Sequence, residues 1–273
     1  MQEDIIQFLK GKANWVRRAT FEIARIAPGI RLASSLSPIE ILTVLYYGRF
    51  LKFAPKNPNW AERDRLIISK GHGSICMYPI LADLGFFDQS LLQRVGQKDS
   101  FLADIPDTRI PGYETINGAM AHGLGVACGM SIALKRKSST SKVFVVSGDG
   151  ELYSGAMWEA IMFAPQHRLG NLTLIVDQNK TAMLDFCKNI IDLEPLAKKL
   201  QDFGWRAAEV DGHNVEHIYS ALKTAQNDSA DCPKVLLAHT IKGKGAPQLE
   251  GDPLCHIKNL KEEELLEIIE KLS

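Results

Sequence analysis

The sequence predicts an α/β protein built on a mostly parallel sheet with helices on both faces. Short runs rich in branched apolar residues have the pattern of strands, and helical segments separate them. Parallel neighbours need a long crossover between them, so this alternation favours helices that cover both faces of one sheet. The strand pattern occurs at residues 65–69, 143–147, 172–176 and 234–238.

The spacing of apolar residues predicts the first two helices. Residues 5–26 repeat apolar side chains at the intervals of an amphipathic helix. The next helix opens with a capping pattern: Ser37 is the expected N-cap, Pro38 takes the first helical position and Glu40 closes a capping box. Its body, residues 41–50, is apolar enough to be mostly buried.

Three later segments are also predicted to be helical. Residues 118–134 are crowded with small side chains, which would let a helix approach its neighbours or a ligand closely. Residues 154–164 fit a helix between two predicted strands. Residues 261–271 form a charged amphipathic pattern that is typical of a solvated surface helix.

Composition places the chain in the globular class and excludes several others. Of its 273 residues 45% are hydrophobic, and 32 basic residues balance 32 acidic ones. We expect a single domain over residues 1–273, with a helical tail from about residue 257, because no repeat or long linker interrupts the chain.

Zero net charge argues against a nucleic-acid partner. No apolar run approaches the ~18 residues of a membrane span, so we expect no membrane association and a cytoplasmic location. Five cysteines without a Cys-x-x-Cys pair indicate neither a disulfide framework nor a thiolate zinc site.

Polar residues follow two neighbouring predicted strands. Gly-Asp-Gly at residues 148–150 comes after one strand, and Asp-Gln-Asn at residues 177–179 comes after the next. Ligands of parallel sheets bind at the carboxyl ends of the strands, so Asp149 and Asn179 are expected at one edge. Their oxygens and the carbonyl of Thr181 make a partial shell for Mg²⁺, which completes its coordination with phosphates and water. The glycines let a phosphate approach the backbone. The arrangement favours a site for a metal-bound diphosphate, although Gly-Asp-Gly alone is more often a plain turn.

Competing motifs are absent or weak. The chain contains neither the phosphate-binding loop of ATPases nor the glycine pattern of dinucleotide-binding folds, and it lacks a serine-hydrolase elbow. His213 and His217 stand four positions apart, as zinc ligands on a helix do. The better interpretation is a turn at residues 211–214 that caps the next helix and leaves His217 on its surface.

The segment from Gly-Asp-Gly onward resembles one enzyme family. Residues 148–160, 169–172 and 177–179 resemble the diphosphate-binding domain of transketolase, a thiamine diphosphate (ThDP) enzyme. Further segments agree in order across nearly the whole chain, and the resemblance is to the first subunit of split transketolases. These are Ser-Lys-Gly-His-Gly at 69–73, Pro-Gly-Tyr-Glu at 111–114, Phe-Gly-Trp at 203–205, Asp-Gly-His-Asn at 211–214 and Thr-Ile-Lys-Gly-Lys-Gly at 240–245.

The resemblance implies a metal site and a diphosphate site. Asp149, Asn179 and the carbonyl of Thr181 would hold Mg²⁺. His72 would contact the diphosphate of ThDP as a cofactor-binding and catalytic residue, and Gly150 would supply a main-chain contact.

Four more residues gain expected roles from the same resemblance. Gly118 and Met120 would lie against the aminopyrimidine and thiazolium rings of the cofactor. Glu159 matches a family carboxylate near the dimer interface that links active sites. His256 falls where the family has a histidine close to the reacting carbon, although its surrounding sequence matches only loosely, and a plain structural role fits it equally well.

The family resemblance also implies a partner chain. In transketolases the glutamate that activates the pyrimidine ring belongs to a second domain, and this sequence ends at Ser273 before any such domain. We therefore expect a C-terminal transketolase subunit that carries the pyrimidine-binding domain, with a heterotetramer as the assembly.

Three positions depart from the family pattern. Arg31 and Ile105 stand where ordinary transketolases have histidines lining the sugar channel, and Ser154 stands where they have a glutamate. Arginine stays charged and isoleucine cannot exchange protons, so sugar recognition must differ. The sequence predicts transfer of a two-carbon ketol unit between a ketose and an aldose, on a specialised sugar or sugar phosphate.

Two alternative functions remain open on the sequence. One is a subunit of another ThDP enzyme acting on a 2-oxo acid, because Gly-Asp-Gly and the distant asparagine serve the wider superfamily. The other is a non-catalytic partner protein that keeps the fold. The intact Asp149 and Asn179 argue against the second alternative.

Overall fold

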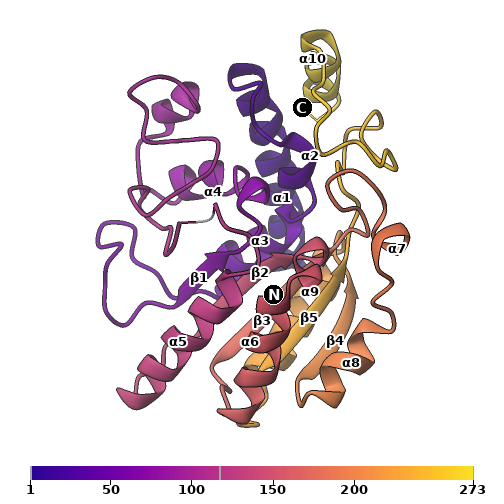
Figure 1. Cartoon of the computed structure of the whole chain (residues 1–273). Helices are drawn as coiled ribbons and strands as arrows, with labels where there is room; N and C mark the ends of the chain where they lie inside the picture. Colours follow the sequence, from indigo (N-terminus) through magenta and orange to yellow (C-terminus); the bar gives the residue numbers. More distant parts are fainter. Residues whose placement is uncertain (1, 117, 273) are drawn as a thin grey trace.

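The computed structural model describes residues 2–116 and 118–272 of the chain. In that part, five parallel strands form one sheet with the order β1-β2-β3-β5-β4. Helices lie on both faces of the sheet (Figure 1), so the predicted fold class is confirmed. The strands are β1 (Arg65–Ile68), β2 (Val143–Gly148), β3 (Leu172–Gln178), β4 (Arg206–Asp211) and β5 (Lys234–His239).

Alternate side chains of the central strands build two separate cores. In β2, Phe144 and Val146 pack on one side of the sheet, while Val143 and Val145 pack on the other. The first core lies under α1 (Gln2–Ile26), α3 (Ile39–Tyr47) and α9 (Val215–Asn227). The second lies under α5 (Gly123–Arg136) and α6 (Gly155–Gln166). Burial on both faces explains why these strands are continuous apolar runs rather than alternating ones.

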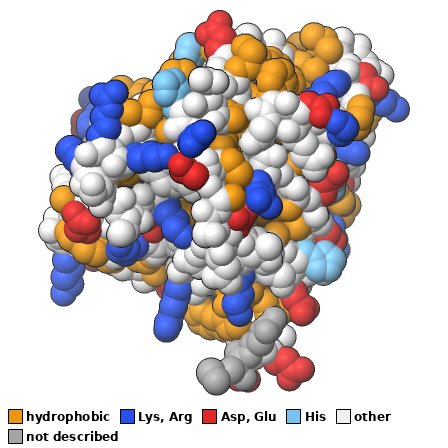
Figure 2. Space-filling view, turned by 90° about the horizontal axis from the view of Figure 1, so that it is seen from below, with side chains coloured by type: hydrophobic (Ala, Val, Ile, Leu, Met, Phe, Trp, Pro, Cys, Tyr) orange, Lys and Arg blue, Asp and Glu red, His pale blue; other side chains and the backbone are white. Residues whose placement is uncertain are grey.

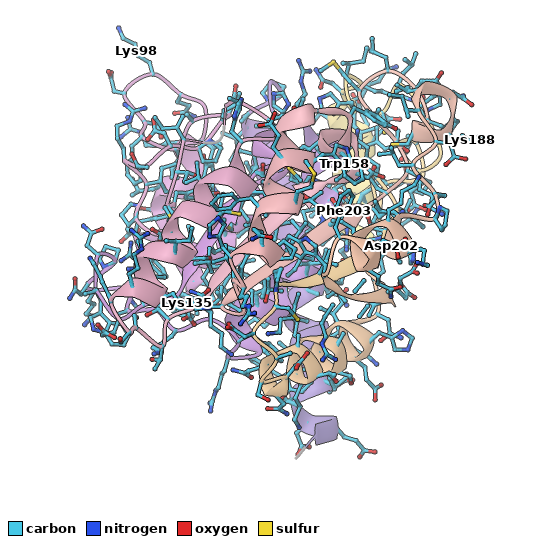
Figure 3. All side chains as sticks on the ribbon, turned by 60° about the horizontal axis from the view of Figure 1, so that its bottom comes forward. Lys98, Lys135, Trp158, Lys188, Asp202 and Phe203 are labelled. Atoms are coloured by element: carbon cyan, nitrogen blue, oxygen red, sulfur yellow. The ribbon has the colours of Figure 1, made fainter. Side chains whose placement is uncertain are left out.

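Shorter helices complete the two layers. Trp158 of α6 lies against Phe203, at the end of α8, with ring centroids 6.0 Å apart (Figure 3), and its indole N–H donates to the carbonyl of Leu152 at 2.7 Å. The remaining helices are α2 (Leu32–Leu36), α4 (Met77–Asp83), α7 (Cys187–Ile190), α8 (Leu196–Asp202), α10 (Glu262–Lys271) and three 3-10 turns at Gly71–Gly73, Gln89–Arg94 and Asp149–Tyr153.

The predicted capping box at the start of α3 is wrong. The residue before the helix is Pro38, and the hydroxyl of Ser37 donates to Oδ2 of Asp177 at 2.6 Å instead of accepting an N–H from the first turn of the helix. The carboxylate of Glu40 is turned toward Arg17 and His213 rather than back to the helix start. Two buried carboxylates need charged and hydrogen-bonding partners, and that requirement outweighs a local cap.

Sequence patterns missed one strand, β4. Its residues are mostly exposed and give no apolar run, because β4 is an edge strand paired only with β5. The four predicted strands are confirmed and end within two residues of their expected limits.

All five strands are parallel, so their carboxyl ends meet at one edge of the sheet. Figure 1 shows α2 and α7 at this end of the molecule. At the opposite end, Figure 2 shows Lys and Arg side chains scattered over the face among acidic ones, without a single basic patch. Of the helices in residues 2–116 and 118–272, none combines the length and apolar character of a membrane span.

Candidate active site

The ends of β2 and β3 bring Asp149 and Asn179 to the same edge of the sheet. The last residue of β2, Gly148, is paired with Asp177 in β3. Lys180 follows β3 and Asp149 follows β2, and the backbone N–H of Lys180 donates to Oδ2 of Asp149 at 2.6 Å. The expected proximity of the two side chains therefore follows from the register of the parallel pair.

A pocket of about 360 Å³ opens at this edge. Seven of the nine site residues selected from the sequence line it, although they come from segments spread between residues 72 and 256. The seven are His72, Met120, Asp149, Gly150, Asn179, Thr181 and His256.

The other two selected residues lie elsewhere. Glu159 is exposed on α6 and lines a separate surface hollow with His122 and Phe163. Gly118 is exposed, and among the described residues beyond its chain neighbours no atom lies within 4 Å of the position that a Cβ would take there. Neither residue faces the pocket in this chain, so their predicted roles depend on groups from outside it.

The donor set at the strand ends suits a hard divalent cation. Asp149 is 8% exposed, and its Oδ1 accepts the backbone N–H of Gly150 at 2.9 Å. Oδ1 of Asn179 accepts the N–H of Thr181 at 3.1 Å. A carboxylate, an amide oxygen and a main-chain carbonyl are ligands that Mg²⁺ prefers, and these residues fit that ion.

The environment of Asp149 makes a positive ion favourable. Burial raises the pKa of its carboxyl to about 6, and the negative charge of Asp177 adds to this. The N–H of Lys180 and the ammonium of Lys70 act in the opposite direction but do not cancel it. A divalent cation at this carboxylate would restore the ionised form at neutral pH.

A buried ion pair supports the pocket from below. Asp177 is fully buried and accepts hydrogen bonds from Ser37, Lys70 and Thr240. Burial raises the pKa of Asp177, but Lys70 and the two hydroxyls outweigh burial and hold it below its ordinary value. No local sequence pattern predicts this pair, although Lys70 lies inside the family motif at residues 69–73.

Two histidines face each other across the pocket. The ring centroids of His72 and His256 are 5.2 Å apart, at an angle of 72° between the rings. The hydroxyl of Ser34 lies 3.0 Å from Nδ1 of His256, whereas Nε2 of this histidine is buried without a partner among the described residues. A buried ring nitrogen that lacks a partner in a pocket wall indicates a ligand position.

Both histidines are neutral. Burial is the largest cause that lowers the pKa of His72, followed by the charges of Arg31 and Lys242. For His256, burial, Lys242 and His72 lower the pKa to about 3. Each ring can therefore exchange hydrogen bonds with a ligand without carrying charge.

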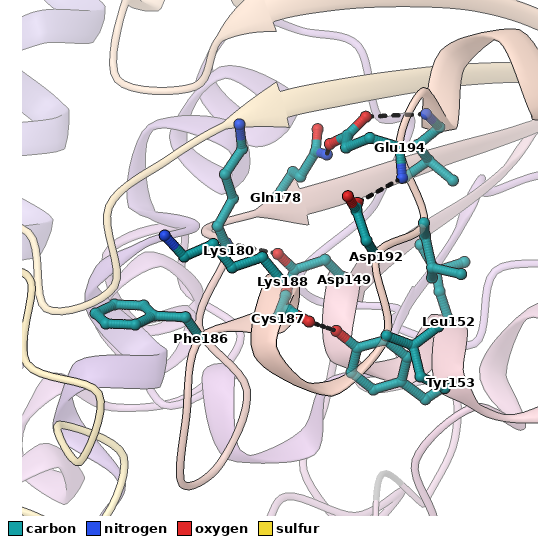
Figure 4. A pocket seen from close by; sticks show the side chains of 13 residues that line it. Asp149, Leu152, Tyr153, Gln178, Lys180, Phe186, Cys187, Lys188, Asp192 and Glu194 are labelled. Atoms are coloured by element: carbon teal, nitrogen blue, oxygen red, sulfur yellow. Dashed lines mark hydrogen bonds between the residues drawn. The ribbon is translucent and has the colours of Figure 1, made fainter.

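A hairpin strap, residues 180–191, closes one side of the pocket. Thr181 and Phe186 form its antiparallel bridge, and the N–H of Cys187 donates to the carbonyl of Lys180 at 2.9 Å. Behind the strap lies a second pocket of about 420 Å³ (Figure 4). The phenol of Tyr153 donates to the carbonyl of Cys187 at 2.9 Å and ties the strap between the two pockets.

Lys242 fastens the strap from inside the pocket. It is 7% exposed, and its Nζ donates to the carbonyls of Thr181 at 3.1 Å and Ala182 at 2.7 Å. The carbonyl of Thr181, the third expected metal ligand, is therefore held at the pocket by a lysine from the loop after β5.

The two histidines of the predicted zinc alternative do not form a metal site. His213 is bonded to Glu40 and to the backbone of Ile241, and His217 is exposed. Within the described chain, no group of three or more His, Cys, Asp and Glu residues could hold a metal ion. The predicted helix cap is confirmed, since Asn214 accepts the N–H groups of Glu216 and His217.

Comparison with known proteins decides the family. Residues 22–273 match the family model for transketolase, thiamine diphosphate binding domain. The chain belongs to the transketolase family. It is 38% identical over 257 residues to the 6-deoxy-6-sulfo-D-fructose transketolase subunit SqwG of Clostridium sp. (strain MSTE9), over 93% of this chain and 92% of that protein. It is also 38% identical to an apulose-4-phosphate transketolase subunit from Actinobacillus succinogenes, over 97% of this chain and 95% of that protein.

A solved transketolase has the same fold. The enzyme from Campylobacter jejuni superimposes with a TM-score of 0.90 at 30% identity, over 97% of this chain. The matched region is 43% of that enzyme, so this transketolase chain spans less than half of its length. The fold and family expected from the sequence are thus confirmed, and a ThDP-binding domain is supported.

Proposed function

We propose that this chain is the subunit of a ThDP-dependent transketolase that binds Mg²⁺ and the cofactor diphosphate. The enzyme transfers a two-carbon ketol unit between a ketose and an aldose. The observation that supports this most is one pocket in which the oxygen donors of Asp149, Asn179 and Thr181 lie with two neutral histidines, His72 and His256. In this proposal the oxygen donors hold the metal, and the histidines contact the cofactor and the sugar.

The metal and the diphosphate occupy the floor of the pocket. Asp149, Asn179 and the carbonyl of Thr181 would hold Mg²⁺, an ion that takes its remaining oxygens from phosphate and water. Lys70 and Lys242 line the same pocket and add positive charge for this anion. ThDP supplies, when bound, a carbon nucleophile that the amino acids lack.

The two histidines serve the cofactor and the sugar. Nε2 of His256 is a buried atom without a partner in the described chain, so it is available to a hydroxyl or carbonyl of the substrate. His72 lies beside it and is held through its carbonyl, which accepts the hydroxyl of Ser35 at 3.2 Å. Because both rings are neutral, they act by hydrogen bonding: in our proposal His72 contacts the cofactor diphosphate and His256 orients the sugar.

The site is completed by a second subunit. The apolar side chains of Met120, Met183, Leu184 and Ile190 line the pocket and are each about half exposed, which suits a surface covered by another chain. In our proposal the partner is a C-terminal transketolase subunit that supplies the pyrimidine-activating glutamate, in a heterotetramer. The two relatives named as subunits support this organisation.

The substrate is a specialised sugar in this proposal. Arg31 lies close enough to lower the pKa of both His72 and His256, so a permanent charge stands where ordinary transketolases have a histidine. Ile105 is 38% exposed and cannot hydrogen-bond through its side chain. The names of both relatives specify unusual sugars, a sulfonated fructose and apulose 4-phosphate.

Reconstitution with the partner subunit tests the function. The expected result is calorimetric binding of ThDP that requires Mg²⁺, followed by ketol transfer with a modified or anionic ketose as donor. Turnover of 2-oxo acids without ketol transfer would favour the other ThDP reaction instead. A complete pair that binds no ThDP would identify the chain as a non-catalytic partner and refute the proposal.

A further inference from the structure

The loop after β5 carries Lys242, and two side chains hold this loop: Arg17 from α1 and His213 from the turn between β4 and α9. The loop, residues 241–246, turns at Gly243, whose N–H donates to the carbonyl of Ala33 in α2 at 3.0 Å. Its first N–H, that of Ile241, donates to Nε2 of His213 at 2.8 Å. Its later carbonyl, that of Lys244, accepts Nη1 of Arg17 at 2.7 Å.

These contacts define the protonation state of His213. A backbone N–H can only donate, so Nε2 of His213 must carry a lone pair. Nδ1 then carries the proton and donates to Oε2 of Glu40, 3.0 Å away. The ring is therefore neutral, with the proton on Nδ1.

Glu40 bonds to both side chains that hold the loop, Arg17 and His213. Its Oε1 accepts Nη2 of Arg17, so one buried carboxylate orients both the guanidinium and the imidazole. Burial raises the pKa of Glu40, but Arg17 and His213 outweigh it and keep the carboxylate ionised. Arg17 packs so closely on the loop that a Cβ at Gly245 would lie 2.9 Å from its Cδ.

The same loop contacts the candidate active site, so these hydrogen bonds also affect the position of pocket residues. Thr240, just before the loop, donates its hydroxyl to Asp177, the buried partner of the pocket residue Lys70. Lys242 reaches across the pocket to the carbonyls of Thr181 and Ala182. A shift of the backbone at Ile241 would move both contacts, including the one on the expected metal ligand.

We propose that His213 is a positioning residue for the cofactor site. It fixes the Lys242 loop through the N–H of Ile241, and it does so only while its ring is neutral. A protonated ring would present an N–H to the N–H of Ile241, so this hydrogen bond would be lost. The inference rests on the proposed function for its consequence in ThDP binding, but the anchoring itself is a property of this chain alone.

The first experiment measures the loop directly, without cofactor. In the full chain, hydrogen exchange of residues 240–246 becomes faster in His213→Leu, because the Ile241 N–H loses its acceptor. The matched control is His217→Leu, a histidine that is exposed on α9 four positions later and should leave the exchange unchanged. Equal exchange in wild type and His213→Leu would overturn the proposal.

The second experiment measures ThDP affinity in the reconstituted pair with saturating Mg²⁺. We expect about tenfold weaker binding for His213→Leu, from the loss of the hydrogen bond and the shift of Lys242. His213→Gln should bind nearly as well as wild type near neutral pH, since its amide oxygen can accept the same N–H. If His213→Leu does not fold, the pH profile of His213→Gln still tests the positioning role.

The pH profile separates positioning from simple packing. On acidification wild type should lose more affinity than His213→Gln, because the amide of glutamine cannot take up a proton and keeps its acceptor for the Ile241 N–H. Asp149 and His72 titrate in both proteins and cancel in the comparison. Glu40 and Asp211 contact His213, and Arg17 pairs with Glu40. The other charged or titratable groups on the segments that these contacts join are Glu216, His217, His239, Lys242 and Lys244, and all of these groups are the same in both proteins.

The outcomes distinguish this inference from the proposed function. Overlapping pH profiles of wild type and His213→Gln, or full affinity of His213→Leu, would refute the positioning role. A wild-type pair that binds no ThDP would refute the proposed function, and the exchange experiment would then still decide whether His213 holds the loop.

Discussion

The hydroxyl of Ser34 lies 3.0 Å from Nδ1 of His256, which joins two residues 222 positions apart in the sequence. When this hydroxyl donates to Nδ1, the ring proton lies on Nε2, the nitrogen that has no partner within the described chain. Burial, Lys242 and His72 lower the pKa of His256 to about 3, so the ring stays neutral above that pH. In this tautomer His256 is a hydrogen-bond donor to a substrate and not a base.

The first prediction concerns this donor. His256→Ala should lower kcat/KM for the sugar about 100-fold, by analogy with the loss of one donor to a developing charge. Ser34→Ala, which only frees the ring, should lower it about fivefold. ThDP affinity, measured by calorimetry, should be unchanged in both variants. Equal sugar kinetics in His256→Ala and wild type would contradict the assignment.

The second prediction concerns the metal. Asp149→Asn removes the carboxylate from the donor set and should weaken Mn²⁺ binding, followed by its electron paramagnetic resonance, about 100-fold or more. The control is Asp192→Asn, an exposed carboxylate on the rim of the second pocket. If the two variants bind Mn²⁺ equally well, Asp149 is not a metal ligand.

The raised pKa of Asp149 gives metal binding by wild type a pH dependence that Asp149→Asn should lack. Metal needs the ionised carboxylate, so Mn²⁺ binding by wild type should weaken as the pH falls below about 6. Without metal, the free energy of unfolding depends on pH in the opposite direction. The folded-state pKa of about 6 lies above the ordinary value of 3.8, so the folded state holds the extra proton between them. The free energy of unfolding of wild type should then fall relative to Asp149→Asn as the pH rises through this range, which denaturation in EDTA would measure.

The third prediction concerns the ion pair beneath the pocket. Asp177→Ala leaves the ammonium of Lys70 buried and without its counter-charge, and should reduce the free energy of unfolding by about 3–5 kcal/mol. Urea denaturation measures this change. The exposed pair Lys135–Asp231 provides the control, because Asp231→Ala should leave the denaturation midpoint unchanged. A small effect of Asp177→Ala would show that Lys70 reaches solvent.

The fourth prediction concerns the substrate. Arg31→His restores the side chain that ordinary transketolases carry, and should raise kcat/KM for an unmodified pentose phosphate about tenfold over wild type. The same variant should lose activity with the preferred modified sugar. Arg31→Lys serves as the comparison, because it keeps the charge without the planar fork. Full wild-type activity on ordinary pentose phosphates would contradict the specialised-sugar proposal.

Much of the site was predictable because it lies where two central strands end. β2 and β3 are buried on both faces, so their residues are continuous apolar runs that can be recognised locally. Asp149 and Asn179 follow those runs, and parallel pairing then requires them to lie together. β4 escaped prediction for the opposite reason, since an edge strand with exposed side chains has no such run.

The sequence by itself therefore predicted four of the five strands, the family and a candidate set of metal donors, because each depends on short segments that can be recognised one after another along the chain. Only the tertiary structure decided how Glu40, His213 and Lys242 act. Their partners lie in other elements, and a local pattern assigned Glu40 to a helix cap and His213 to a turn. The physical reason is burial: a charge removed from water takes the partner that the packed chain offers, and that partner is set by the fold as a whole.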